Sequence, residues 1–180
     1  FDPSQQGEGI ADVMTHLVDL AQWECFPNQP LDYTKDIHID SAKHWTTDLS
    51  LSQFKAITGT SNFPSYLKKN MAADTLLKIF FNGSINYTIR GIHIKTTARW
   101  NYKAPEGGDS YYALMKGTKA NLIIRQGREQ NYAPALYIEP AVQGEEYENT
   151  LNENFRSIQS KYPGVELKKN DKGWEVIIPE

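Results

Sequence analysis

The stretch GIADVMTHLVDLAQW, residues 9–23, decides how the rest of the chain can fold. At about 3.6 residues per turn, four of its polar and aromatic side chains share one face of a helix. These four are Asp12, His16, Asp19 and Trp23. The other face is apolar and carries Ile10, Val13, Met14, Leu17, Val18, Leu20 and Ala21. The stretch therefore predicts an amphipathic helix over residues 10–25 that ends before Pro27.

His16 is the residue of this helix that could carry chemistry. A carboxylate one turn before an imidazole and another one turn after it can orient and polarise the ring, and Asp12 and Asp19 hold those positions. The same spacing also suits an ordinary hydrogen-bonding histidine on a half-buried helix face. Asp12 and His16 could share a metal ion, but no second histidine lies nearby in the sequence, so we predict no metal site.

The spacing D-x-x-x-H-x-x-D after a glycine resembles the start of the C-terminal domain in the Gfo/Idh/MocA family of NAD(P)-dependent oxidoreductases. Gly9, Asp12, His16 and Asp19 match that pattern, whereas Met14 stands where the family commonly has glycine. Further segments resemble one subgroup of these domains, the oxidoreductase C-terminal domain, so that the resemblance covers nearly all of the chain. They are residues 45–59, Phe63-Pro64, Asn82-Gly83, Arg90-Gly91 and residues 116–120.

The resemblance implies hydride transfer between a sugar or polyol and NAD or NADP. His16 would be the general acid and base on the reacting hydroxyl, Asp12 would orient His16 or bind the substrate, and Asp19 would bind the substrate or support the helix. In the family, the nucleotide fingerprint and a catalytic lysine lie in an N-terminal nucleotide-binding domain. We therefore expect that domain as a partner, and we expect this chain alone to bind no cofactor and to be inactive. The resemblance also implies a homo-oligomer formed through the open face of the sheet.

The composition restricts the class of protein. Hydrophobic residues make up 39% of the 180 residues, which is typical of a globular domain with a sizeable core. The net charge of -3 and the lack of a basic run argue against a nucleic-acid partner. No apolar run approaches the roughly 18 residues of a membrane span.

The cysteine content and the first residues bear on location and processing. The single Cys25 cannot form an internal disulfide, which fits the cytoplasm but leaves the periplasm open. Because the chain begins with Phe1 rather than Met, we expect that a segment or domain has been removed upstream. Residues 1–9 have the composition of a linker. Their Gly7-Glu8-Gly9 triplet is not a dinucleotide fingerprint, because Asp12 replaces the third glycine and no strand precedes it.

The remaining chain predicts many hairpin-connected strands, then a second long helix and a last pair of strands, with short helical segments near the start. A strand near residues 37–41 is followed by a short helix at residues 51–58, which residues 46–50 can cap and Gly59 ends, and by a helical turn near residues 64–69. Asn82-Gly83 between two apolar runs is typical of a type I′ hairpin, and the phase of the apolar residues flips at Gly91, which indicates a bulge or a sharp bend. Further strands are predicted at residues 110–115, 120–126, 135–139, 165–168 and 174–178, and a second long helix at residues 145–161.

This order of elements predicts the fold class. Strands joined by short turns, with long helices before and after them, indicate an α+β fold with a largely antiparallel open sheet and the two long helices packed on one face. We expect a single domain over residues 10–180. If the open face of the sheet exposes aromatic residues and isoleucines together, that face predicts a subunit interface.

Two features outside the first helix are candidate substrate contacts. His93 follows the phase flip at Gly91, so it is either an ordinary strand residue or a side chain that a bulge aims into a cleft. Trp100 and Asp109 bound a segment rich in proline and glycine, which suits either a carbohydrate site or a plain hairpin loop.

The rival interpretation is a stand-alone carbohydrate-binding or structural module, which would keep the aromatic loops and need no tuned histidine. A hydrolase has less support, because the sequence contains no G-x-S-x-G motif and no evident partner for Cys25.

Overall fold

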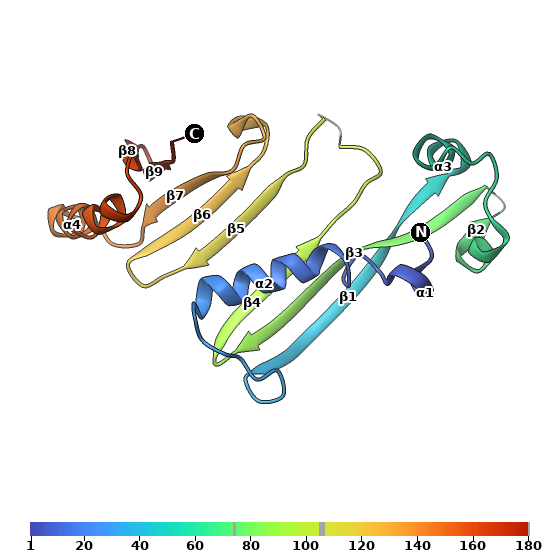
Figure 1. The fold of residues 1–180 in the computed structure, drawn as a ribbon, viewed down its shortest axis with the longest axis horizontal. Coiled ribbons are helices and arrows are strands. Elements are labelled where there is room, and N and C mark those ends of the chain that lie inside the picture. The colour runs from blue at the N-terminus through green and yellow to red at the C-terminus, as the bar shows by residue number, and fades with distance from the viewer. Residues whose placement is uncertain (74, 105–106, 180) are drawn as a thin grey trace. The chain divides into compact units, whose positions relative to one another are not determined.

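The computed structural model describes residues 1–73, 75–104 and 107–179, and Figure 1 shows its ribbon. The chain divides into two compact units, Phe1–Lys103 and Ala104–Glu180. The single domain expected over residues 10–180 stays a prediction.

The first unit is built around one long central strand. Its helices are α1 (Pro3–Gln6), α2 (Val13–Cys25), α3 (Leu51–Thr58) and the 3₁₀ helix η1 (Ser65–Asn70), and its strands are β1 (Ile37–Ser50), β2 (Met71–Ala73), β3 (Leu76–Ile89) and β4 (Ile92–Ala98). All pairings are antiparallel: β1 follows one edge of β3, and β2 and β4 pair with different lengths of β3 on its other edge.

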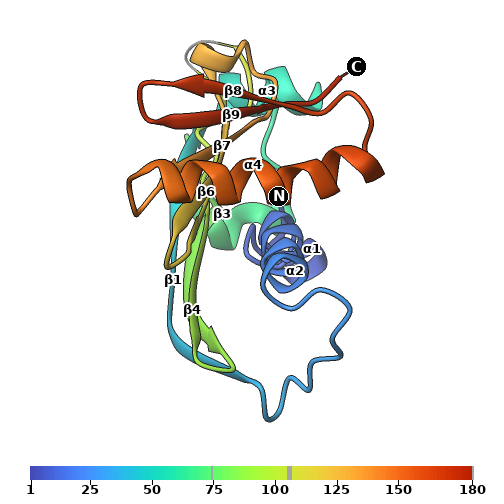
Figure 2. The same ribbon diagram turned by 90° about the vertical axis from the view of Figure 1, so that its left-hand side faces the viewer.

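The two faces of this sheet differ in character. Figure 2 shows α1 and α2 on the same side of the strands. The side chains of β3 that point to this side are apolar and buried, with Tyr87 2% and Ile89 0% exposed. Further along β3, Leu77 and Ile79 join a core cluster with residues of β1, α3 and η1, namely Leu49, Phe54 and Leu67. Because successive side chains of a strand alternate between faces, the other face receives Asn82, Ser84, Asn86 and Thr88 and is polar.

The short helix α3 begins and ends as its sequence predicts. The Ser50 hydroxyl accepts from the Gln53 backbone N–H at 3.3 Å, and the Gln53 side chain accepts from the Ser50 backbone N–H at 2.8 Å. This reciprocal capping box satisfies two N–H groups that the first turn would otherwise leave unpaired. Gly59, with φ of +73°, ends the helix in the left-handed conformation. The strand before it is longer than predicted, because β1 pairs with β3 as far as Ser50.

The hairpin predicted at Asn82-Gly83 is wrong, because β3 passes through both residues without turning. The buried Asn82 amide donates to the Trp45 carbonyl and the Thr47 hydroxyl, and its oxygen accepts from the Trp100 backbone N–H. A Cβ on Gly83 would lie 2.2 Å from Cγ1 of Ile10. Packing and hydrogen bonding therefore account for this Asn-Gly pair, and turn geometry does not.

The chain reverses instead at Arg90-Gly91, where Ile89 pairs with Ile92. Both turn residues have positive φ, +45° and +85°, as a type I′ turn requires. The bend predicted at Gly91 is thus a two-residue hairpin. Arg90 Nη2 donates to Asp36 Oδ2 at 2.9 Å, and this hydrogen bond lowers the pKa of Asp36 below its ordinary value.

The second unit is a five-stranded antiparallel sheet with one helix. Its elements are β5 (Tyr111–Lys116), β6 (Ala120–Gln126), the 3₁₀ helix η2 (Arg128–Gln130), β7 (Ala135–Pro140), α4 (Glu145–Lys161), β8 (Glu166–Asn170) and β9 (Gly173–Ile177). The strand order is β5-β6-β7-β9-β8. Helix α4 packs on this sheet through Phe155, which is 5% exposed, and through Leu151 and Tyr147 beside Trp174. Ile158, the fourth apolar residue of the predicted stripe, is 43% exposed.

The predicted α+β class and its antiparallel pairing are confirmed. The strands form two open sheets: β1, β2 and β4 pair with β3 in the first unit, and β5 to β9 form the sheet of the second unit. Each long helix packs on the sheet of its own unit. Within the described residues, no helix has both the length and the apolar character needed to cross a membrane.

Candidate functional site

Helix α2 carries the main candidate residues on its exposed side. Met14 is fully buried, and Leu17, Val18 and Ala21 are half-buried on the side that packs on the sheet next to β4. His16 and Asp19 are exposed, and Trp23 is 70% exposed. Val13 and Leu20, expected on the buried face, are 48% and 41% exposed. The exposed side of α2 therefore combines polar groups with apolar surface.

The start of α2 differs from the prediction, because the helix begins at Val13 and not at Ile10. Residues 8–12 form a turn in which the Glu8 carbonyl accepts from the N–H groups of Ala11 and Asp12. Gly9 fixes this turn to the sheet, since its N–H donates to the Phe80 carbonyl at 2.9 Å. Asp12 is consequently the residue just before the helix, and its carboxylate makes no capping hydrogen bond.

The carboxylates around His16 form no hydrogen bonds or ion pairs with the residues that the structure describes. Among the described residues, the side chains of Asp12, His16 and Asp19 have no hydrogen-bonding or ion-pair partner, and Asp12 is not bonded to His16. An exposed imidazole with two uncommitted carboxylates one turn away can accept a proton, donate it, and form hydrogen bonds to hydroxyl groups. The role of Asp12 in orienting His16 stays a prediction.

His93 is an exposed residue of β4 that lies opposite Thr88, and its Nδ1 is 3.1 Å from the Thr88 hydroxyl. This places it on the face of the sheet away from α2. The structure therefore does not bring His93 and His16 together, and the hairpin turn at Arg90-Gly91 accounts for the phase flip that drew attention to His93.

Trp100 and Asp109 lie in different units. Trp100 is half-buried and packs against Phe81 and Tyr102, with ring centroids 5.3 and 6.4 Å away. Its indole is thus already used in the core of the first unit. Asp109 is exposed, and its carbonyl accepts from Gln126 at 3.4 Å. Pro105 and Glu106, within the same candidate segment, lie outside the described residues.

Sequence reasoning missed a basic pocket of about 350 Å³ on the polar face of the first unit. Its lining comes from β1, β3, β4 and the residues after β4, and comprises Lys43, Trp45, Ser84, Lys95, Thr97, Arg99 and Asn101. The alternation of Lys43 with Trp45, and of Lys95 with Thr97 and Arg99, was the available signal. It became meaningful only when β1 and β4 were known to flank β3.

The second unit has a pocket of about 250 Å³ that is lined by both cationic and anionic side chains. Arg125 there donates to Glu139 at 3.2 Å and lies over the Tyr137 ring. Because its arginine is already paired, this pocket offers less to an ionic ligand.

The histidines, acidic residues and glycines bear on metal and dinucleotide binding. In the described parts of the chain, no three His, Cys, Asp or Glu side chains are grouped so that they could share a metal ion. A Cβ on Gly9 would lie 2.0 Å from the Phe81 carbonyl oxygen, so this glycine is required for contact with the sheet. Residues 7–9 accordingly do not fit the phosphates of a dinucleotide.

Comparison with known proteins identifies the family. The family model described as "Putative oxidoreductase C terminal domain" matches residues 1–180. The chain belongs to this family. As an oxidoreductase C-terminal domain, it can be placed in the Gfo/Idh/MocA family, as its first motif indicates. No curated protein matches it.

One solved structure is similar to nearly the whole of this oxidoreductase C-terminal domain. It is a putative oxidoreductase from Parabacteroides merdae, with 49% sequence identity and a TM-score of 0.93. The match covers 97% of this chain and 40% of the other chain. The chain thus spans less than half the length of the protein that it resembles.

Proposed function

We propose that this chain is the substrate-binding domain of an NAD(P)-dependent oxidoreductase that acts on a hydroxyl group of a sugar or polyol. The observation that carries the proposal is the uncommitted His16 between Asp12 and Asp19 on the exposed side of α2, in a chain of this family. In this proposal, the nicotinamide is held by the N-terminal nucleotide-binding domain that the family resemblance implies.

In the proposed reaction, a ring nitrogen of His16 accepts the proton of the substrate hydroxyl, or returns it in the reverse direction. The carboxylates of Asp12 and Asp19 hydrogen-bond neighbouring hydroxyls or the imidazolium that forms. The nicotinamide, when bound, accepts or supplies the hydride. Trp23 offers an exposed aromatic face two turns from His16, on which a sugar ring could stack.

The test is cofactor binding and turnover by the full-length protein that carries this chain. We expect a saturable change in NADH or NADPH fluorescence, and NAD(P)-linked oxidation of at least one sugar or polyol in a substrate panel. The isolated chain, shown to be folded by circular dichroism, should give neither signal. A full-length protein that binds neither nucleotide would contradict the proposal, as would saturable NADH binding by the isolated chain.

We also propose that the full-length protein oligomerises through the sheet face of the second unit that points away from α4. Tyr112 and Leu114, 60% and 39% exposed, lie on this face, where the neighbouring Tyr137 is half-buried and Ile123 is buried. Such an apolar group on an open face is typical of an interface between copies. The open face of the first unit is polar and offers less apolar area.

Sedimentation of charged variants tests the interface. Leu114→Glu in the full-length protein is expected to shift the population toward a smaller species, because a buried unpaired charge is costly. Ile158→Glu, a matched change at an exposed residue of α4, should leave the mass unchanged. An equal effect of both variants, or of neither, would argue against this face.

A further inference from the structure

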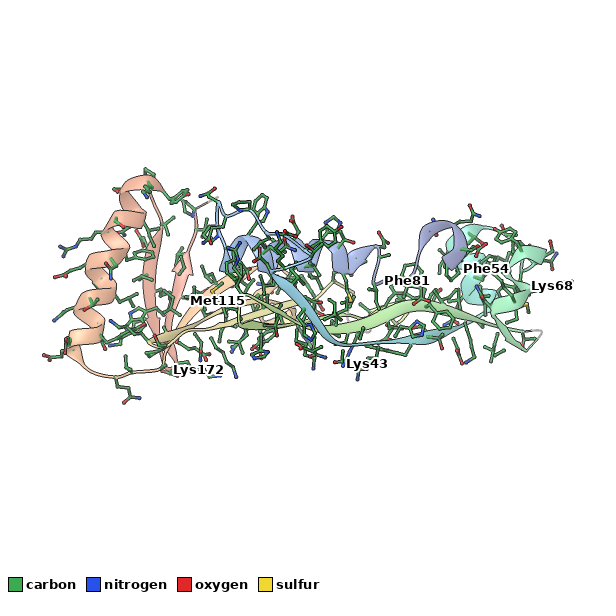
Figure 3. All side chains as sticks on the ribbon, turned by 90° about the horizontal axis from the view of Figure 1, so that it is seen from below. Lys43, Phe54, Lys68, Phe81, Met115 and Lys172 are labelled. Carbon is green, nitrogen blue, oxygen red and sulfur yellow. The ribbon has the colours of Figure 1, made fainter. Side chains whose placement is uncertain are left out.

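The polar face of the first unit gathers three cationic side chains in the pocket between β1, β3 and β4. Lys43 of β1 lies opposite Ser84 of β3, and Ser84 lies opposite Thr97 of β4. Lys95 and Arg99 are two residues before and after Thr97, so their side chains leave the strand on the same face. Figure 3 shows the labelled Lys43 on the side of the sheet away from α2.

These cations have no acidic partners among the described residues. None of Lys43, Lys95 and Arg99 forms an ion pair with a carboxylate of any residue that the structure describes. The chain as a whole carries a net charge of -3, whereas the side chains that line this pocket carry three positive charges. Like charges close together repel one another, and an anion placed among them relieves that repulsion.

An aromatic ring and two hydroxyls organise the pocket. Lys43 Nζ and Arg99 Cζ lie 5.8 and 6.0 Å from the ring centroid of Trp45, which can hold both side chains by cation–π attraction. The Ser84 hydroxyl lies 2.9 Å from the Thr97 hydroxyl and donates to the Thr96 carbonyl at 3.1 Å. The pocket therefore offers charged donors to a ligand, whereas its two hydroxyls are hydrogen-bonded to each other and to the Thr96 carbonyl.

We propose that this pocket binds a phosphate group, carried by inorganic phosphate or by a phosphate monoester. Three cations suit a phosphate dianion better than a single carboxylate, and a guanidinium can bind two phosphate oxygens at once. Its volume of about 350 Å³ leaves room for a phosphate with a small organic group attached. The site lies across the sheet from His16, and the inference does not rest on the proposed function.

Calorimetric titration of the full-length protein at constant ionic strength tests the proposal, with inorganic phosphate and glycerol 1-phosphate as probes. We expect saturable binding of at least one probe, and affinity reduced about tenfold or more in Lys43→Gln/Arg99→Gln, since two charge-assisted contacts are lost. The single variant Lys95→Gln should also weaken binding. The matched control is Lys116→Gln/Lys119→Gln, which removes two exposed cations of the second unit and should bind like the unaltered protein.

The two probes distinguish the source of the phosphate. Tighter binding of glycerol 1-phosphate assigns the pocket to a monoester, and equal binding assigns it to phosphate itself. No saturable binding, or an equal loss in the matched control, would overturn the proposal. Displacement of phosphate by equimolar acetate would replace it with a carboxylate site. A smaller species on sedimentation of Lys43→Gln/Arg99→Gln, without phosphate binding, would assign the face to contact between copies.

Discussion

Replacing His16 with alanine in the full-length protein is expected to lower turnover by a factor of about 100 to 10,000, the range typical of a lost general acid or base. The imidazole is exposed and has no partner among the described residues, so its removal takes away no internal hydrogen bond. Substitutions at such exposed positions usually change the free energy of unfolding by less than about 0.5 kcal/mol. Loss of turnover should therefore occur without loss of thermal stability.

His38→Ala is the matched control for this prediction. His38 is an exposed histidine of the same unit, in β1, with Asp40 3.8 Å away as its ionic neighbour. Its removal should leave turnover and thermal unfolding unchanged. If His16→Ala retains full turnover on a substrate that the unaltered protein oxidises, the catalytic role of His16 is excluded. If both histidine variants lose turnover equally, the effect is not specific to α2.

Local sequence signals predicted the bounds of α3 and α4, whereas α2 begins later than predicted and α1 lies in residues that were assigned to a linker. Ser50 and Gln53 cap the start of α3 and Gly59 ends it, so the predicted bounds of this helix agree with the structure at both ends. Helix α4 also occurs where its apolar spacing predicts it, at Glu145–Lys161. In both helices the deciding contacts lie within a few residues along the chain, which is the range that a pattern in the sequence describes.

The errors arose where distant segments decide the outcome. Asn82-Gly83 has the composition of a turn, but Trp45, Thr47 and Trp100 satisfy the Asn82 side chain, and Ile10 occupies the space beside Gly83. The three residues that hydrogen-bond to the Asn82 side chain lie 18 to 37 residues away from it along the chain. Local propensity could not predict them.

The candidate site residues show the same difference between local and long-range contacts. The residues of α2 were predicted together because one helix face holds them. Trp100 was a candidate substrate contact in a segment that suited either a carbohydrate site or a plain hairpin loop, and its indole packs against Phe81 and Tyr102. The basic pocket was missed because Arg99 approaches Trp45 of β1 only through the register of β1, β3 and β4.

Gly9→Ala is expected to lower the free energy of unfolding by about 3 kcal/mol or more, at the upper end of the usual cost of forcing extra volume into a packed site. The added Cβ would lie 2.0 Å from the Phe81 carbonyl oxygen and 2.7 Å from its Cα. Both atoms belong to the backbone of β3, so no side-chain rotation can relieve the clash. The turn before α2 would have to move off the strand, which would also break the hydrogen bond from the Gly9 N–H to Phe80.

Thermal unfolding and turnover of the full-length protein measure both consequences of this change. Because residues 9–12 lead directly into α2, their displacement should re-aim His16 and lower turnover together with the melting temperature. Gly127→Ala is the matched control, since its backbone is extended and the nearest atom to an added Cβ is Gln130 Oε1 at 3.7 Å. It should unfold like the unaltered protein. A Gly9→Ala variant as stable as Gly127→Ala would mean that the turn does not contact β3 so closely, and α2 would then need another anchor to the sheet.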